Sequence, residues 1–236
     1  MSAKFKNKEI TTVAIIPARS GSKNIINKNI KKIKNKPLLV WAIETCKMSK
    51  KIDYFFVLTD SNSYKHLAEK NGAKVPFKRP KSISRDSSND LEFVEYSIKK
   101  LAEIKIYPKI IVNIRPTTPF RDYKVIDRAI NNFIKNYKHY SSLRSIEEMP
   151  ETSFKTVILE NKIAKPIIKK YTMDQINSPR QKFKKTYSPN GYIDIYKTEN
   201  IVKNKNLYGK KSLAFLTKRT IEIDDLYDLE LARKFA

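Results

Sequence analysis

The sequence is poor in cysteine, glycine and histidine, and each shortage excludes a class of protein. Its 236 residues include one cysteine, four glycines and two histidines. A lone Cys46 cannot form an internal disulfide framework or a multi-cysteine metal site, so we expect a reducing, cytoplasmic setting. His66 and His139 lie far apart, without metal-ligand spacing around them.

Long apolar runs are also missing. No stretch approaches the roughly 20 residues that cross a membrane, so we expect no membrane partner. Residues 1–8 carry no apolar core, so a secretory signal is not expected either. A hydrophobic fraction of 40% is nevertheless typical of a globular protein, and the length suits one domain spanning residues 1–236.

Acidic residues are the minority among the charged ones, with 24 Asp and Glu against 49 Lys and Arg. This excess of positive charge is compatible with nucleic-acid binding. The lysines, however, are spread along the whole chain and no nucleic-acid-binding motif is present, so we expect no nucleic-acid partner. The arginines are more informative, because they fall in or beside loops that other signals mark as functional: Arg19, Arg79, Arg115, Arg121 and Arg180.

Strand and helix patterns alternate through the first part of the chain. Apolar runs predict buried strands at residues 11–16, 54–58 and 109–114. Apolar periodicity and capping residues predict helices at 37–48, 63–71, 89–104 and 125–137. This alternation is typical of a Rossmann-like, open and mostly parallel sheet with helices on both faces. Ligands of such sheets bind beyond the carboxyl ends of the strands, where the loops after residues 16, 59 and 114 converge.

The alternation breaks in the second part of the chain. We predict that residues 145–189 form an insertion standing off the sheet, with a β-hairpin at 154–167 that turns at 160–162. Strands return at 192–196 and 212–217, and a helix at 224–235 closes the sequence.

The loop after the first strand has the composition of a phosphate site. Arg19, Lys23 and Lys28 follow a strand that Pro17 ends. An arginine offers a planar fork and a lysine a point charge, and a triphosphate needs both. Gly21 is the only glycine here, so the loop is neither a Walker loop nor a GxGxxG loop. The alternative is that these cations are simply solvated.

Two carboxylates near the end of the sequence could hold a metal ion. If residues 221–224 form a strand, Glu222 and Asp224 share one face, because side chains alternate with a period of two. Two carboxylates beside a triphosphate form a hard-oxygen site suited to Mg²⁺. The alternative is that Asp224 and Asp225 are the cap and first-turn acids of the closing helix.

Residues 15–23, Ile-Ile-Pro-Ala-Arg-Ser-Gly-Ser-Lys, followed by Asn27-Lys28-Asn29, resemble the opening of the CMP-sialic acid synthetases, or acylneuraminate cytidylyltransferases. The resemblance continues at Arg79-Pro80 and at residues 113–121, 178–195 and 221–232. The chain departs from the family pattern at four positions. Arg115 replaces a glutamine, Ser188 stands where an arginine is frequent, and Asp194 stands where a tyrosine is frequent. Glu222 replaces the first aspartate of the family's Asp-x-Asp and reaches one methylene further.

The resemblance implies a reaction in which the anomeric 2-hydroxyl of a nonulosonic acid attacks the α-phosphate of CTP, giving a CMP-nonulosonate and pyrophosphate with Mg²⁺ as cofactor. The implied catalytic residues are Arg19, Lys23, Lys28 and Asp224, and the implied metal ligands are Asp224 and Glu222. The implied nucleotide-binding residues are Ala18, Arg19, Ser20, Gly21, Lys23, Asn29, Arg79, Arg115 and Pro116, with Asp86 and Asp90 as further candidates. The implied sugar-binding residues are Arg115, Thr117, Arg180, Gln181, Asn190, Asp194 and Tyr208.

The resemblance also implies a homodimer formed through the insertion, with Arg180 reaching toward the partner's site. Arg121 either belongs to the ligand crevice or only braces the end of a strand. The sequence leaves the sugar open among N-acetylneuraminic, legionaminic and pseudaminic acids. The remaining alternatives are a CMP-Kdo-type synthetase, a wider sugar nucleotidyltransferase, which usually has a glycine-rich loop, and a basic nucleic-acid-binding protein.

Overall fold

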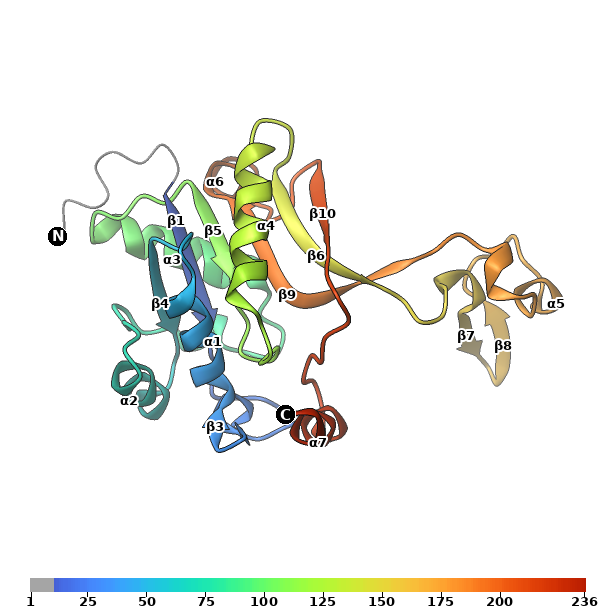
Figure 1. Ribbon diagram of the computed structural model, residues 1–236, viewed down its shortest axis with the longest axis horizontal. Coiled ribbons are helices and arrows are strands. Elements are labelled where there is room, and N and C mark those ends of the chain that lie inside the picture. Colours follow the sequence, from blue (N-terminus) through green and yellow to red (C-terminus); the bar gives the residue numbers. More distant parts are fainter. Residues whose placement is uncertain (1–10) are drawn as a thin grey trace.

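The computed structural model describes residues 11–236, so the prediction for residues 1–8 lies outside the described residues. A six-stranded sheet forms the centre, with the strand order β10-β6-β9-β5-β1-β4 (Figure 1). Its strands are β1 (Thr12–Pro17), β4 (Tyr54–Leu58), β5 (Ile110–Asn113), β6 (Ser142–Glu148), β9 (Tyr187–Lys197) and β10 (Ser212–Leu216). Two short strands, β2 (Lys32–Ile33) and β3 (Lys36–Pro37), pair with each other.

Only β9 runs against the other strands of this sheet. β1 pairs in parallel with β4 and β5, and β6 pairs in parallel with β10. β9 lies antiparallel between β5 and β6, so the five remaining strands share one direction. The predicted open and mostly parallel sheet is therefore confirmed.

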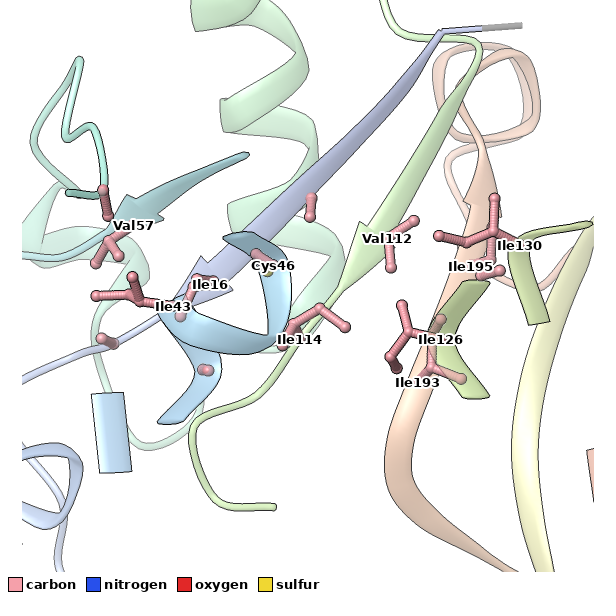
Figure 2. Packing of buried hydrophobic residues seen from close by; sticks show 14 of the residues in the cluster. Ile16, Ile43, Cys46, Val57, Val112, Ile114, Ile126, Ile130, Ile193 and Ile195 are labelled. Atoms are coloured by element: carbon pink, nitrogen blue, oxygen red, sulfur yellow. The ribbon is translucent and has the colours of Figure 1, made fainter. Parts of the chain in front are cut away.

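Helices cover both faces of the sheet. They are α1 (Leu38–Met48), α2 (Asn62–Lys70), α3 (Asp90–Glu103), α4 (Tyr123–Lys135) and α6 (Thr198–Asn204). The closing helix α7 (Leu226–Phe235) instead packs against Ile33 of β2 and Leu38 of α1. Ala14 and Ile16 of β1 belong to a buried cluster with α1 and α4, which Figure 2 shows. Val13 and Ile15 belong to a second cluster, with α3 and α6. Alternate side chains of one buried strand thus serve two cores, as expected for a parallel strand covered on both sides.

Strand β6 was not among the strands predicted from the sequence. Its residues, Ser-Leu-Arg-Ser-Ile-Glu-Glu, mix polar and apolar side chains and so lack the apolar run of a buried strand. It forms because β9 and β10 provide hydrogen-bonding partners on both of its sides. β9 likewise begins at Tyr187, five residues before the predicted start at 192, because its first residues pair with the end of β6.

The ends of β6 and β9 leave the sheet as a two-stranded ribbon that carries residues 149–186, which we call the arm. In Figure 1 the arm stands away from the rest of the chain. It holds the hairpin of β7 (Val157–Glu160) and β8 (Ile163–Pro166) and the short helix α5 (Met173–Ile176). Asn161 and Lys162 form the predicted turn with positive φ angles of 49° and 68°. Leu159 and Ile163 are exposed by 77% and 58%, so the hairpin of the arm leaves apolar surface uncovered within its own chain.

Residues 221–224 do not form a strand, so the alternation that would place Glu222 and Asp224 on one face does not apply. No strand within residues 11–236 pairs with this segment, and the Ile223 N–H donates to the Thr117 carbonyl at 2.8 Å. Ile223 is buried against Leu229 of α7. α7 begins with Asp225 as its N-cap, and the Asp228 side chain completes the capping box.

None of the helices within residues 11–236 has both the length and the apolar character required to cross a membrane.

Candidate functional site

A cavity of about 190 Å³ lies at the carboxyl ends of β1 and β5. The loop after β1, the loop after β5, the first turn of α3 and the segment before it form its walls. Its lining residues are Pro17, Arg19, Ser22, Lys28, Asn29, Arg79, Ser88, Asp90, Phe93, Arg115, Pro116 and Thr117. A larger cavity of about 1050 Å³ lies among α4, the end of β10 and α7, but no predicted site residue lines it. The smaller cavity is therefore the candidate site.

Two of the predicted phosphate-binding cations share one carboxylate. The Arg19 guanidinium lies 2.5 Å and the Lys23 ammonium 3.3 Å from the two oxygens of Asp86. The hydrogen bond from Arg19 lowers the pKa of the Asp86 carboxyl. Because the three side chains are partly or largely exposed, a phosphate ligand could replace Asp86 at little cost.

The backbone of the same loop is fixed from two sides. Ser20 donates its N–H and its hydroxyl to the two oxygens of Asp60, at 2.8 and 2.9 Å. The Asn29 amide donates to the Arg19 carbonyl at 2.9 Å. Ala18 is buried and continues the β1–β4 ladder, whereas Gly21 is exposed with open space around it. The loop is thus held in place before any ligand binds.

Lys28 joins this loop to the carboxylates near the end of the sequence. Its ammonium donates to the Ile223 carbonyl at 2.9 Å and lies 3.6 Å from the Asp224 carboxylate. Segments almost 200 residues apart in sequence therefore meet beside the cavity.

Glu222 and Asp224 were predicted as metal ligands. Burial raises the pKa of the Glu222 carboxyl, the charge of Arg115 lowers it and that of Asp224 raises it. An ideal Cβ built on Gly191 would lie 2.4 Å from Glu222 Oε1, so this carboxylate is packed against the glycine backbone. Asp224 is exposed, and the cap of α7 is Asp225, not Asp224.

Residues 11–236 contain no group of three or more His, Cys, Asp or Glu side chains placed to hold a metal ion. A protein Mg²⁺ site, however, commonly has only one or two carboxylates and completes its shell with water and phosphate oxygens. The donor set of Glu222 and Asp224 fits such an ion.

Arg79 is buried under the cavity. It donates to the Ile83 carbonyl, and its guanidinium lies 5.0 Å from the centre of the Phe93 ring. Burial lowers the pKa of Arg79, and the charge of Asp60 raises it. Nε and one terminal nitrogen of Arg79 donate to Ile83, so the other terminal nitrogen is the one that could donate to a ligand in the cavity.

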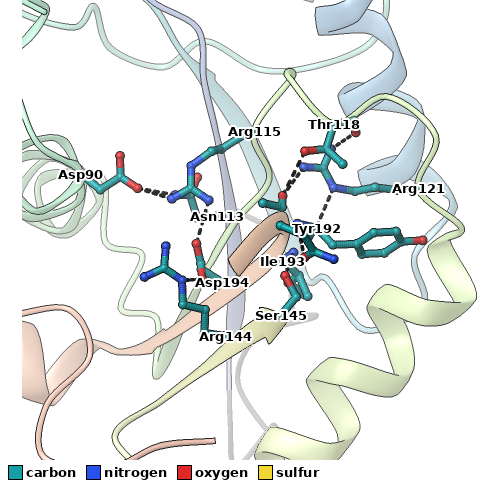
Figure 3. Close-up of polar contacts among 12 residues, drawn as sticks. Asp90, Asn113, Arg115, Thr118, Arg121, Arg144, Ser145, Tyr192, Ile193 and Asp194 are labelled. Atoms are coloured by element: carbon teal, nitrogen blue, oxygen red, sulfur yellow. Dashed lines mark hydrogen bonds and ion pairs between the residues drawn. The ribbon is translucent and has the colours of Figure 1, made fainter. Parts of the chain in front are cut away.

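Arg115 and Arg121 have different environments, which Figure 3 shows. Arg115 lines the cavity and donates to Asp90 and Asp194. Burial alone would lower the pKa of its guanidinium, but the charges of Asp90 and Asp194 raise it well above the ordinary value.

Arg121 is buried behind the loop and does not line the cavity. It donates to the carbonyls of Tyr192, Gly191 and Thr118, the first two at 2.6 and 2.7 Å. These contacts brace the loop after β5 against β9, which agrees with the second of the two interpretations of Arg121.

Five of the seven predicted sugar-binding residues do not line this cavity. Arg180 and Gln181 lie on the arm, where Arg180 donates to Glu148 at 2.8 Å. Asn190 is buried and donates to Thr217 at 2.6 Å. Tyr208 packs edge-on against Tyr196, 5.6 Å between ring centres. Of the remaining sugar-side candidates, Arg115 and Thr117 line the cavity, and Asp194 lies behind it.

Some residues of the site were not predicted from the sequence. Asp60 fixes the first loop, and its position directly after β4, the same edge of the sheet, was an available signal. Ser22, Ser88 and Phe93 line the cavity but belong to patterns that also fit a loop or an ordinary helix face.

Known proteins resemble the chain along most of its length. A family model described as cytidylyltransferase matches residues 13–233. An N-acylneuraminate cytidylyltransferase of Escherichia coli is 30% identical over 93% of this chain, which spans about half (51%) of that relative. A CMP-N,N'-diacetyllegionaminic acid synthase of Legionella pneumophila is 26% identical over 94% of both chains.

The fold resembles that of a solved CMP-2-keto-3-deoxy-manno-octonic acid synthetase complexed with CTP. The TM-score is 0.70 at 16% identity, over 95% of this chain and 98% of that one. The predicted resemblance is thus confirmed by sequence as well as by fold, and the chain belongs to the cytidylyltransferase family, with CMP-sialic acid synthetases among its relatives.

Proposed function

We propose that the protein transfers CMP from CTP to a nonulosonic acid and releases pyrophosphate. The observation that carries this proposal is the contact of Lys28, which lines the cavity, with the backbone at Ile223 and Asp224, because it joins the cationic loop to the segment that carries Asp224. The names of the relatives from E. coli and L. pneumophila, which specify N-acylneuraminate and N,N'-diacetyllegionaminic acid, support this class of sugar.

The residues of the first loop would bind the triphosphate. Arg19 and Lys23 would exchange their contact with Asp86 for the β- and γ-phosphates and stabilise the leaving pyrophosphate. Such a transfer depends on positioning and charge neutralisation more than on covalent catalysis. Arg79, stacked on Phe93, would direct its guanidinium to the acceptor edge of the cytosine.

Glu222 and Asp224 would hold a Mg²⁺ ion, which would neutralise charge on the phosphate oxygens. Lys28 lies 3.6 Å from the Asp224 carboxylate and keeps it beside the first loop. Because Glu222 is half-buried and packed on Gly191, its carboxylate has little freedom to move before a ligand arrives.

We also propose a homodimer formed through the arm. Arg180 and Gln181 lie on the arm rather than at the cavity, so a partner's arm would have to supply them. Exposed apolar side chains of the arm, among them Leu159, Ile163 and Ile167, would be buried in such a contact. A monomer in sedimentation at micromolar concentration would contradict this proposal. Since CTP is a cytoplasmic metabolite, we place the enzyme in the cytoplasm.

A substrate panel tests the proposed function. Purified protein is supplied with CTP, Mg²⁺ and, in turn, N-acetylneuraminic, legionaminic, pseudaminic and Kdo acids, and pyrophosphate is measured. We expect release with at least one nine-carbon acid and little with Kdo. Release with Kdo alone would favour the CMP-Kdo alternative, for which the solved structure at 16% identity supports only the fold. No release with any acid would refute the proposal.

A further inference from the structure

A chain of alternating charges runs from the cavity wall through the sheet. Asp90, at the start of α3, accepts from Arg115, and Arg115 donates to Asp194 of β9 at 2.7 Å. The other oxygen of Asp194 lies 3.5 Å from Nε of Arg144 on β6. The Arg144 guanidinium lies 4.8 Å from the centre of the Tyr208 ring. Figure 3 shows the first four of these residues in this order.

Asp194 occupies the most enclosed position of this chain. Its side chain is 2% exposed, and β9 pairing places it directly between Asn113 of β5 and Arg144 of β6. A carboxylate buried to this degree needs compensating charge, and the two arginines provide it. Conversely, Asp194 draws Arg115 back toward the sheet, so Asp194 and Asp90 together determine where the Arg115 guanidinium lies.

The four charged side chains of this series together carry no net charge. Asp90 and Asp194 balance Arg115 and Arg144, and both terminal nitrogens of Arg115 already donate to carboxylates. The bonds that Asp90 accepts, from Asn113 and Arg115, reach the same oxygen, Oδ2. The other carboxylate oxygen of Asp90 has no hydrogen-bond partner among the described residues, and in Figure 3 it points away from Asn113 and Arg115. A ligand carboxylate placed here would face Asp90, whereas a hydroxyl or an amide N–H could donate to it.

We propose that Asp194 and Arg144 are positioning residues that hold Arg115 in the cavity wall, and that this wall binds a neutral donor group of the sugar acid, a hydroxyl or an acylamino N–H, instead of its carboxylate. The inference rests on the proposed function. The carboxylate of the acid is then bound by other cations. Two departures from the family pattern, Arg115 and Asp194, are direct partners and form one unit.

Steady-state kinetics of Asp194→Asn, Arg144→Met and the double variant test the positioning role, with Arg128→Met, an exposed arginine of α4, as control. We expect the KM for the acid to rise about tenfold in each single variant, with less than about a twofold change in the KM for CTP. Because Arg144 acts through Asp194, the double variant should match Asp194→Asn within about twofold.

A second comparison tests the neutral character of the wall. The acid and its carboxamide analogue are supplied to the wild type and to Arg144→Met, whose side chain is 37% exposed and therefore the safer variant for folding. If the wall binds a neutral group, the ratio of the KM for the acid to the KM for the carboxamide is the same in the wild type and in Arg144→Met. A ratio that shifts in the variant would show that Arg115 binds the carboxylate and would overturn the inference.

The other outcomes are equally decisive. In the Asp194 and Arg144 variants, equal rises in the KM for the acid and the KM for CTP would place the wall against the nucleotide. Unchanged KM values for both substrates would show a structural role only. Either result refutes the inference and leaves the proposed function standing. A wild type that releases no pyrophosphate with any acid would refute the proposed function, and the inference with it.

Discussion

Replacing Arg121 by methionine should destabilise the protein strongly, although Arg121 does not line the cavity. Its guanidinium is buried and donates to three backbone carbonyls, those of Thr118, Gly191 and Tyr192. Burial lowers the pKa of Arg121 to about 10, with a partial opposing effect from Cys46. Methionine fills much of the same volume but has no donor, so the carbonyls lose their partners.

The magnitude follows from the three acceptors. Each buried polar group that loses its partner lowers the free energy of unfolding by about 1–3 kcal/mol. Removal of the buried guanidinium charge offsets part of that loss. We therefore expect a loss of about 4 kcal/mol in the free energy of unfolding. For a chain of this length that corresponds to a melting temperature lower by about 10 °C.

Urea and thermal unfolding followed by circular dichroism measure the effect. Arg128→Met is the matched control, because Arg128 is exposed on the neighbouring helix α4, and its loss should stay within about 0.5 kcal/mol. A loss below about 1 kcal/mol for Arg121→Met would show that the carbonyls find other partners and that the brace is not needed.

Four further changes give separate outcomes. Arg19→Ala should abolish pyrophosphate release while the circular dichroism spectrum stays unchanged; near-normal release would contradict its phosphate role. Asp86→Asn removes the carboxylate that occupies Arg19 and Lys23, so calorimetry at low salt should show tighter CTP binding, and the difference should shrink at high salt. Gly191→Ala should cost about 1–2 kcal/mol in thermal unfolding, because φ is +62° and Glu222 must move away from the new Cβ. Glu222→Gln should raise the melting temperature at pH 7 but not near pH 3. The folded state raises the pKa of Glu222, so the stabilisation by its neutral carboxyl is lost as the pH rises through the folded-state pKa, whereas glutamine stays neutral.

The sequence predicted those elements whose own residues carry the signal. β1, β4 and β5 are apolar runs, and all three form where they were predicted. The phosphate role of the loop that follows β1 stays a prediction. β6 could not be recognised, since its partners β9 and β10 lie far along the chain. Residues 221–224 show the opposite case, because their alternating pattern is compatible with a strand but no strand within residues 11–236 pairs with them.

In the site, too, features with a local sequence signal were predicted, and features that depend on a distant partner were not. Arg19, Lys28 and Arg115 were predicted to line one crevice and do so, because the ends of parallel strands must meet at one edge. Asp194 was itself a candidate site residue, but its contact with Arg115, 79 residues earlier, had no local signal. This contact depends on the register of β9 against β5, which only the folded sheet determines.

The arm has a topological consequence. Glu148, where the chain leaves the sheet, is paired in register with Tyr187, where it returns. A tight turn could therefore join these two positions, and the parallel sheet with its cavity would keep every strand. Insertions at such a junction can grow, shrink or be exchanged during evolution without altering the register of the sheet that carries the chemistry. If the arm forms the proposed homodimer contact, family members could change how they assemble independently of the reaction that they catalyse.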